Sequence, residues 1–413
     1  MTAYGLDAFL DEPDGSSTAK FVRRPLILHI TGDYPDPVRD RTTLAVKNFI
    51  NLLDDCDHII VSLKRRAHIG QCYLQRCEGE SRQTLFALGY WSLPAGVFHR
   101  NAMNRVAIQV RSIIADLGVR PDLIMAHKLT IEGVVAYRLW QFFGIPYVCS
   151  VRGEVEDKFF RFKPELRSLF GKVIAQAEAL LFVSAWFRKR IEARYPGLVR
   201  RQALLPNFST RPATTVAVPR DDRAMVSVLD LNMYRRKGLH DLIAALAETS
   251  RKVSGIRLDI IGWSRPEITA RLQRMVDGAG VASSVRFLGV MTHEEVLRAM
   301  PRYGALVLPA RKETFGMVYV EALLSGLPIL YTAESGIDGY LDGLDVGVRV
   351  PMGDVRAIAE GLHALVRDGQ RYRNTLLGNY ERVRERFAPE PHLCAFRKLL
   401  FNIMEQRNGG HGQ

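Results

Sequence analysis

Short apolar runs alternate with longer amphipathic stretches along most of the chain, and they form two successive series. The runs of the first series cover residues 25–31, 58–63, 123–126, 147–151 and 179–183. Those of the second cover residues 225–229, 257–261, 284–288, 305–308 and 328–331, with helical periodicity over 239–253, 266–279, 293–300 and 315–324. Strands that alternate with helices are typical of parallel sheets covered by helices. The pattern therefore predicts an α/β chain with two Rossmann-like, doubly wound domains.

The two series are separated by residues 208–223, which are rich in Thr, Pro and Ala and show no apolar period. Such a composition is typical of a linker. We therefore predict the following organisation: a mobile tail over 1–20, a first domain over 21–207, a linker over 208–223, a second domain over 224–388, and an amphipathic helix with a tail over 389–413.

Composition narrows the class of protein. The 413 residues are 47% hydrophobic with a mean hydropathy of −0.04, and no apolar run approaches the roughly 18 residues of a membrane span. The first residues lack the basic start and apolar centre of a signal peptide. The five cysteines form no CxxC pair and no zinc-type array with histidines. We expect a cytoplasmic protein with free thiols, no metal site and no cofactor.

The charge balance predicts an anionic partner. Lys and Arg number 57 against 44 Asp and Glu, which makes the formal net charge +13. The basic clusters are short and scattered and match no nucleic-acid-binding module, so an anionic membrane surface or a diphosphate-linked lipid fits better than nucleic acid. In the first domain Trp186 and Phe187 precede three cations, Arg188 to Arg190, as expected of a membrane contact. The alternative is that both aromatic residues belong to the core.

The most informative segment is residues 309–328. It contains Glu313 in a polar loop, then Gly316, and then Glu321 as the only charge of an otherwise apolar helical turn. A carboxylate in such surroundings is costly unless polar groups meet it, and ligand hydroxyls would serve. The first amides of a helix that follows a glycine bind diphosphate oxygens well. Hydroxyls and a diphosphate together indicate a nucleotide sugar.

Glu313 and Glu321 are separated by seven residues, with Phe-Gly after the first and Ala after the second. This arrangement resembles the signature of the retaining glycosyltransferases of family 4, which have the GT-B fold. The resemblance covers nearly the whole chain from Pro25 onward. It implies two Rossmann-like domains that face a cleft and a C-terminal helix that crosses back to the first domain. It also implies transfer of a sugar from a nucleotide-sugar donor to a hydroxyl of a lipid-linked or saccharide acceptor, without a metal.

The resemblance assigns roles to residues of the second domain. Glu313 and Lys237 are the candidate catalytic residues, with Glu313 facing the sugar hydroxyls and Lys237 facing the diphosphate. Glu321 is expected to bind the ribose. The other predicted donor-binding residues are Thr314, Phe315, Gly316, Met317, Arg236, Gly289 and Val290.

One position departs from the family pattern. An arginine usually precedes the lysine by five or six residues, and here Asn232 and Leu231 occupy those places. The second positive charge then comes from Arg235 or Arg236, or is absent. A solvated basic turn remains an alternative for this segment.

The predicted acceptor-binding residues lie in the first domain, after apolar runs, because ligands of open α/β sheets bind at the carboxyl ends of the strands. They are Gly32, Asp33, His127 and Arg152. Arg152 stands where many family members have a histidine, and a guanidinium can hold hydroxyls or phosphate but cannot act as a base. For the loop after Gly32 an ordinary charged connection is an equal alternative, and for His127 a structural role is the alternative.

Two other classes of function remain open. A nucleotide-sugar epimerase of GT-B-like fold needs acid and base groups on both sides of the sugar, which the scarcity of histidines disfavours. A non-catalytic partner in a polysaccharide assembly complex fits the missing arginine but not the intact Glu313 and Glu321. A metal-binding DxD at Asp55 and Asp57 is disfavoured because the pair lies in a polar turn. By analogy with the family that the chain resembles, we expect the protein to act at the inner face of a membrane, in bacterial polysaccharide or lipopolysaccharide biosynthesis.

Overall fold

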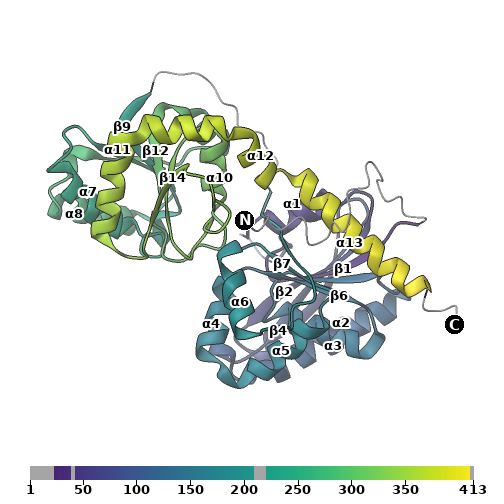
Figure 1. The fold of residues 1–413 in the computed structure, drawn as a ribbon. Helices are drawn as coiled ribbons and strands as arrows, with labels where there is room; N and C mark the ends of the chain where they lie inside the picture. Colours follow the sequence, from purple (N-terminus) through teal and green to yellow (C-terminus); the bar gives the residue numbers. More distant parts are fainter. Residues whose placement is uncertain (1–22, 39–41, 209–219, 410–413) are drawn as a thin grey trace. The chain divides into compact units, whose positions relative to one another are not determined.

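The structure is a computed structural model that describes residues 23–38, 42–208 and 220–409. The chain forms two compact units, each built around one sheet (Figure 1). Of the described residues, unit 1 contains those up to Val183, residues 187–208 and residues 388–409. Unit 2 contains residues 184–186 and 220–387. The predicted tail over 1–20 lies outside the described residues.

Sheet A, in unit 1, has eight strands in the described part of the chain, in the order β3-β4-β2-β1-β5-β6-β7-β8. The strands are β1 (Leu26–Thr31), β2 (Asp57–Arg66), β3 (Tyr73–Cys77), β4 (Gln83–Trp91), β5 (Leu123–Ala126), β6 (Tyr147–Val151), β7 (Ala179–Phe182) and β8 (Gln202–Leu204). All neighbours are parallel except β3, which runs antiparallel to β4. The sequence predicted five of these strands and missed β3, β4 and β8. Two of the three are short edge strands with little buried surface.

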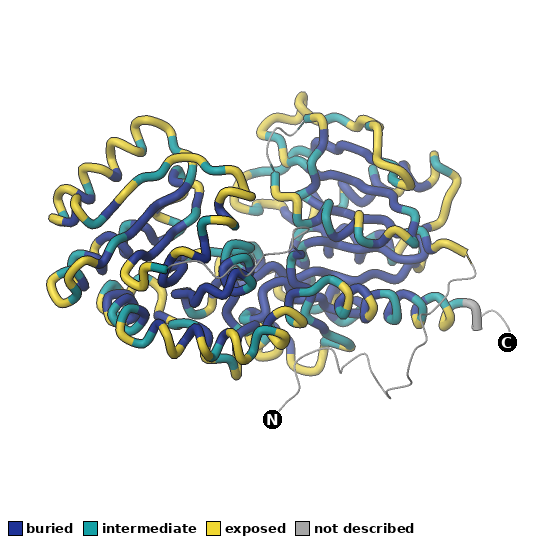
Figure 2. Tube along the Cα trace, turned by 90° about the horizontal axis from the view of Figure 1, so that it is seen from above, coloured by how far each residue is buried: buried dark blue, intermediate teal, exposed yellow. Residues whose placement is uncertain are grey.

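Helices cover both faces of sheet A. They are α1 (Ala45–Asn51), α2 (His99–Leu117), α3 (Glu132–Phe143), α4 (Glu154–Phe162), α5 (Arg167–Gln176), α6 (Arg188–Arg194) and α13 (Pro389–Gly409). One core cluster joins α1 and α13 to a single face of the sheet, through residues such as Phe49, Met125 and Leu400. Figure 2 shows the strands as a continuous buried layer. In the described residues no helix is both long and apolar enough to span a membrane.

The C-terminal helix α13 belongs to unit 1, which confirms the predicted return to the first domain. Its Phe396 meets Phe49 edge to face, with ring centroids 5.4 Å apart. Its Arg397 donates to both carboxylate oxygens of Asp55, at 2.9 and 3.1 Å. Asp55, one half of the DxD-like pair, thus holds this helix.

Sheet B, in unit 2, has six parallel strands in the described residues, in the order β11-β10-β9-β12-β13-β14. The strands are β9 (Asp221–Val228), β10 (Arg257–Ile261), β11 (Val285–Gly289), β12 (Tyr303–Val307), β13 (Ile329–Thr332) and β14 (Gly347–Val350). The helices are α7 (Leu239–Ser250), α8 (Pro266–Gly278), α9 (His293–Ala299), α10 (Met317–Leu324), α11 (Val355–Gly378) and α12 (Tyr380–Phe387). The predicted linker ran too far, because residues 221–223 already pair in β9. Phe208, its predicted first residue, is buried in the core of unit 1.

The strand orders identify where each sheet can bind a ligand. In sheet A the chain order reverses between β1 and β5, and in sheet B it reverses between β9 and β12. Loops that leave neighbouring strands in opposite directions open a crevice at their carboxyl ends. Gly32 and His127 follow β1 and β5, whereas Lys237 and Glu313 follow β9 and β12. The residues predicted from the sequence therefore lie at both switch points.

Candidate functional site

Lys237 and Glu313 form an ion pair at the switch point of sheet B. The ammonium group of Lys237 contacts Oε2 of Glu313, and the two side chains are 23% and 14% exposed. Both charges are thus partly shielded yet accessible from solvent. The structure brings together the two residues that the sequence singled out, which are 76 positions apart.

Close backbone packing explains why these residues meet. Gly238 adopts φ +70°, and a Cβ there would lie 1.9 Å from the carbonyl oxygen of Pro309, so the Lys237 loop fits against the Glu313 loop only with glycine. The carbonyl oxygen of Arg236 also accepts from the amides of Arg311 at 2.9 Å and Lys312 at 3.3 Å. The two loops are therefore joined by their main chains.

Side chains that the sequence analysis did not identify fix the Glu313 loop. Arg311 donates two hydrogen bonds of 2.8 Å to the buried carboxylate of Asp241, in the first turn of α7. The amide of Glu313 donates to Oγ of Ser335 at 3.0 Å, and its carbonyl oxygen accepts from the amide of Gly336 at 2.9 Å. Ser335 lies in the loop after β13, and its position after a predicted strand could have identified it as a residue near the site.

Helix α10 begins at Met317, as predicted, after Gly316 at φ +80°. A Cβ at Gly316 would lie 2.5 Å from the ring of Tyr319, which is buried and donates to the carbonyl oxygen of Leu308 at 2.5 Å. The amide of Thr314 donates to Oε1 of Glu313 at 3.2 Å. Glycine thus lets the start of α10 lie directly beside Glu313.

Phe315, a predicted donor-binding residue, contributes its side chain to the core of unit 2. Its side chain is buried and packs against Tyr340 and Phe387, with ring centroids 5.4 and 6.1 Å away. The ring anchors the loop to the core of unit 2, and the predicted role of Phe315 in donor binding stays a prediction for its main chain. Only the main chain of Phe315 remains for a ligand.

A second group of predicted residues lies at the end of β11. Gly289 has φ +73° and an exposed backbone, and the side chain of Val290 is exposed. Helix α9 follows, and its first residue, His293, places Nε2 at 2.9 Å from Oε1 of Glu321. Glu321 is mostly buried in α10. Sequence reasoning missed His293.

Asn232 stands at a position where the family has an arginine, and its side chain contacts Arg265. Asn232 accepts from the amide of Arg265 at 3.1 Å and from its Nε at 3.3 Å. Arg236 donates instead to the carbonyl oxygen of Lys312 at 3.1 Å, and Arg235 donates to the hydroxyl of Tyr234 at 3.0 Å. The guanidinium group nearest to Asn232 in the described structure is thus that of Arg265, which precedes α8.

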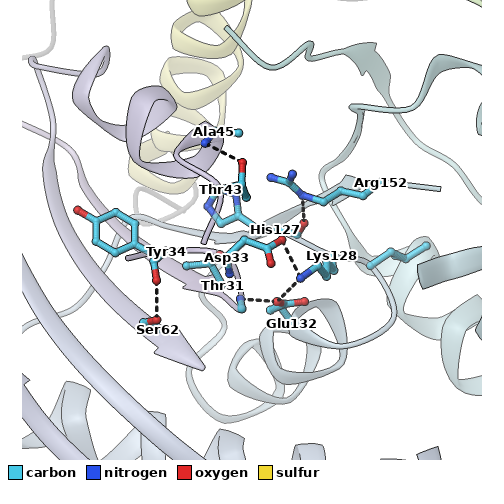
Figure 3. A network of polar contacts seen from close by, with 12 residues as sticks. Thr31, Asp33, Tyr34, Thr43, Ala45, Ser62, His127, Lys128, Glu132 and Arg152 are labelled. Atoms are coloured by element: carbon cyan, nitrogen blue, oxygen red, sulfur yellow. Dashed lines mark hydrogen bonds and ion pairs between the residues drawn. The ribbon is translucent and has the colours of Figure 1, made fainter. Parts of the chain in front are cut away.

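At the switch point of sheet A a network of polar contacts holds the loop after β1 (Figure 3). Nζ of Lys128 lies 2.8 Å from Oδ2 of Asp33 and 3.9 Å from Oε1 of Glu132. The same Oε1 accepts from the amide of Gly32 at 2.7 Å. Lys128 and Glu132 were not predicted, although Lys128 directly follows His127 after β5 and Glu132 begins α3.

Arg152 and His127 are also joined at this edge. Nε of Arg152, after β6, donates to the carbonyl oxygen of His127 at 3.0 Å. Both side chains line a small cavity of unit 1 with Ser150, Phe49 and Asn207. The four residues predicted to bind the acceptor therefore gather at one edge of sheet A, and their role stays a prediction.

His127 is part of a buried chain of three histidines. Its Nε2 lies 3.2 Å from Nδ1 of His29, whose Nε2 lies 3.0 Å from Nδ1 of His58. Nε2 of His58 lies 3.0 Å from the carbonyl oxygen of Leu53, so that nitrogen must carry a proton. Burial lowers the pKa of all three imidazoles and keeps them neutral. In neutral rings each Nε2 donates along the chain, which leaves Nδ1 of His127 without a proton.

Two carboxylates are fully buried below this edge. Burial raises the pKa of Glu132, and it raises the pKa of Glu156 to about 7. Oε1 of Glu156 accepts from the amide of Leu129 at 3.1 Å. The loop after β5 is thus fixed from below by a carboxyl group that stays largely protonated at mildly acidic pH.

The predicted membrane contact is wrong for one of its two aromatic residues. Phe187 is fully buried and packs on Phe160, with ring centroids 5.7 Å apart. Trp186 is half-buried. Arg188 pairs with Glu192 at 3.0 Å on α6. The alternative interpretation, a core residue, therefore holds for Phe187.

The chain resembles known proteins in sequence and in fold. Residues 219–382 match the family model of glycosyl transferases group 1. The chain is 26% identical over 291 residues to glycogen synthase of Mycobacterium tuberculosis, covering 67% of each chain. It is 27% identical over 301 residues to N-acetyl-alpha-D-glucosaminyl L-malate synthase of Bacillus anthracis, covering 70% of this chain and 77% of that protein.

Solved structures show the same fold. Sucrose-phosphate synthase from Thermosynechococcus elongatus superposes with a TM-score of 0.69 at 19% identity, covering 94% of this chain and 100% of the other. The lipopolysaccharide outer core galactosyltransferase WaaB superposes with a TM-score of 0.63 at 16% identity, covering 91% and 99%. The fold is GT-B. The match to glycosyl transferases group 1 lies in the second unit, and the relatives that the chain resembles over two thirds of its length include glycosyl-transferring enzymes such as glycogen synthase.

Proposed function

We propose that the protein is a retaining glycosyltransferase that binds a nucleoside diphosphate sugar at the carboxyl edge of sheet B. The observation that supports this most directly is the accessible Lys237–Glu313 pair beside the start of α10. A cation and free helix amides suit a diphosphate, and a neighbouring carboxylate suits sugar hydroxyls. Two solved structures of other proteins with a similar fold contain related ligands, one UDP and glucose and the other UDP-2-fluoro glucose.

In this proposal Lys237 and the nearby helix amides act by electrostatic stabilisation. Lys237 and the amides after Gly316 offset the negative charge that grows on the leaving diphosphate, and such fixed dipoles and charges usually dominate this kind of catalysis. The bond between the anomeric carbon and the diphosphate oxygen breaks, the acceptor oxygen bonds to the same face, and the diphosphate takes the acceptor's proton. Glu313 holds the sugar hydroxyls and forms no covalent bond. The mechanism uses no metal ion, so a chelator leaves the rate unchanged.

We assign the acceptor to unit 1. Asp33 and Lys128 at its switch point present a carboxylate and an ammonium group, which together suit a polar acceptor such as a saccharide. Curated relatives include the lipopolysaccharide core biosynthesis glycosyltransferase LpsE of Rhizobium meliloti, which is 27% identical over 199 residues. A saccharide or lipid-linked acceptor of bacterial surface polysaccharide synthesis fits both observations.

We further propose that unit 1 associates with anionic membranes through the end of α4. Phe162 is 65% exposed there, and the guanidinium group of Arg161 lies 5.3 Å from its ring centroid. Lys163 follows this aromatic residue and lies 3.8 Å from Glu165, whereas Lys158, on the same helix, pairs with Glu154 at 2.8 Å. A basic residue near an anionic surface contributes about 1 kcal/mol. Sedimentation with anionic vesicles should therefore fall when Phe162→Ser and Lys163→Gln are combined, and no sedimentation of the wild type at low salt would contradict the proposal.

A donor panel tests the proposed reaction. Thermal unfolding is measured with UDP-, GDP-, ADP- and dTDP-sugars, because a ligand that binds the folded chain raises its melting temperature. The donor that stabilises most is then given to the enzyme with saccharide acceptors, and NMR determines the anomeric configuration of the product. We expect one base to be preferred and the configuration to be retained. An inverted product would exclude the retaining mechanism, and no stabilisation by any donor would exclude the site.

A further inference from the structure

His293 contacts the carboxylate of Glu321. Nε2 of His293 lies 2.9 Å from Oε1 of Glu321, and no lysine or arginine of the described residues pairs with this carboxylate. The side chain of Glu321 is 14% exposed and that of His293 is 41% exposed. A carboxylate only accepts hydrogen bonds, so the imidazole donates. The mostly buried charge of Glu321 is therefore held from its solvent side by His293.

The backbone under His293 is fixed. Thr292 caps α9 reciprocally: its Oγ1 accepts from the amide of Glu295 at 3.3 Å, and its amide donates to Oε2 of Glu295 at 2.7 Å. Such a capping box holds the first turn of a helix in place. His293 is the first residue of that turn, three residues after the exposed Val290. The imidazole is therefore presented to Glu321 from a rigid helix start.

We propose that His293 is a positioning residue for Glu321, and that the pair makes the site select ribonucleotides over 2′-deoxyribonucleotides. This inference rests on the proposed function and on the role that the family resemblance implies for Glu321, which is to bind the ribose of the donor. With Oε1 held by the imidazole, Oε2 remains to accept from the ribose hydroxyls. A deoxyribose leaves this mostly buried carboxylate short of a donor. Sites built to bind a hydroxyl reject analogues that lack it.

Calorimetric titration of the full chain tests the selection. UDP, GDP and ADP are each compared with dUDP, dGDP and dADP, so that the base is matched within each pair. We expect the wild type to bind the preferred ribonucleotide at least tenfold more tightly than its 2′-deoxy counterpart. This selection should be nearly lost in His293→Phe, with a ratio within threefold, mainly because ribonucleotide binding weakens. His293→Gln keeps an N–H donor and should restore part of the ratio.

The matched control is Glu294→Gln, on the same helix turn, where the exposed Glu294 pairs with Arg298 at 3.1 Å. It should leave the ratio unchanged. Equal binding of ribo- and deoxyribonucleotides by the wild type would overturn the inference. A His293→Phe variant that weakens both nucleotides by the same factor would overturn the positioning role. If no nucleoside diphosphate binds the wild type, the proposed function itself fails, which is a different result from binding without selection.

Discussion

The carboxyl edges of the two sheets hold charged groups in different ways. At sheet B the ion pair of Lys237 and Glu313 stays accessible, and main-chain contacts at Gly238 and Arg236 align it. At sheet A the carboxylates of Glu132 and Glu156 are buried. The carboxyl groups of Glu132 and Glu156 accept hydrogen bonds from the amides of the loops, and the charged groups of Asp33 and Lys128 remain accessible at the surface. The comparison suggests that sheet B presents its charges to a ligand, whereas sheet A uses most of them to shape a loop.

In the proposed function the two units bind different substrates. A diphosphate needs a cation and free amides, which the sheet B edge provides at Lys237 and Gly316. A polar acceptor needs directed donors and acceptors, which the sheet A edge provides at Asp33 and Lys128. Four predictions test whether this division holds.

The largest effect is expected at the ion pair. Lys237→Ala and Glu313→Gln should each reduce turnover by about a hundredfold or more, because Lys237 offsets the charge of the leaving diphosphate and Glu313 holds the sugar hydroxyls. Lys237→Ala should also weaken binding of the nucleoside diphosphate, whereas Glu313→Gln should not, since Gln leaves Lys237 free for the diphosphate. Steady-state kinetics and calorimetry measure the two effects. Lys312→Ala, beside Glu313 and exposed, is the control. Turnover within a few fold of wild type in both variants would disprove the site.

Gly238→Ala tests the main-chain alignment. A Cβ at this position meets the carbonyl oxygen of Pro309 at 1.9 Å and adds the strain of φ +70°. We expect a loss of about 2 kcal/mol in the free energy of unfolding and weaker nucleotide binding. The control is Gly280→Ala, which has φ +69° with open space around it, and should cost about 1 kcal/mol. Urea unfolding compares them, and equal losses would show that the contact with Pro309 does not matter.

Lys128→Met tests the assignment of the acceptor to sheet A. Removing the ammonium group leaves Asp33 and the buried Glu132 without their cation. We expect the KM for a saccharide acceptor to rise about tenfold, near 1.4 kcal/mol, with nucleotide affinity within twofold of wild type. Lys172→Met, an exposed lysine of the same unit, serves as the control. Loss of nucleotide binding in Lys128→Met would break the division between the two sheets.

The smallest effect concerns the buried carboxyl group below sheet A. The pKa of Glu156 is raised from its usual 4.5 to about 7, so the folded chain holds a proton that the unfolded chain releases. Stability should therefore fall as pH rises from about 4.5 to 7. Glu156→Gln removes this dependence, so the variant should gain on the order of 1 kcal/mol on wild type between pH 5 and pH 8. Urea midpoints at both pH values measure it, and parallel curves would exclude a protonated Glu156.

Several features were readable in the sequence because they depend on short-range patterns. Alternating apolar runs predicted the α/β class and most strands, and Gly316 before an apolar stretch predicted the start of α10. Glu313, Glu321 and Lys237 stood out because charge in an apolar or glycine-bounded segment is unusual. Each signal lies within a few residues of the chain.

Only the tertiary structure decided which of these segments meet. Strand order depends on pairing between distant residues, so the switch points could not be read from periodicity. The burial of Phe315 depends on Phe387, and the partner of Glu321 is His293 from a different helix. The ion pair of Lys128 and Asp33 likewise joins the loops that follow β5 and β1. Local sequence determined the chemistry of each loop, but long-range packing selected the partners that give this chemistry its geometry.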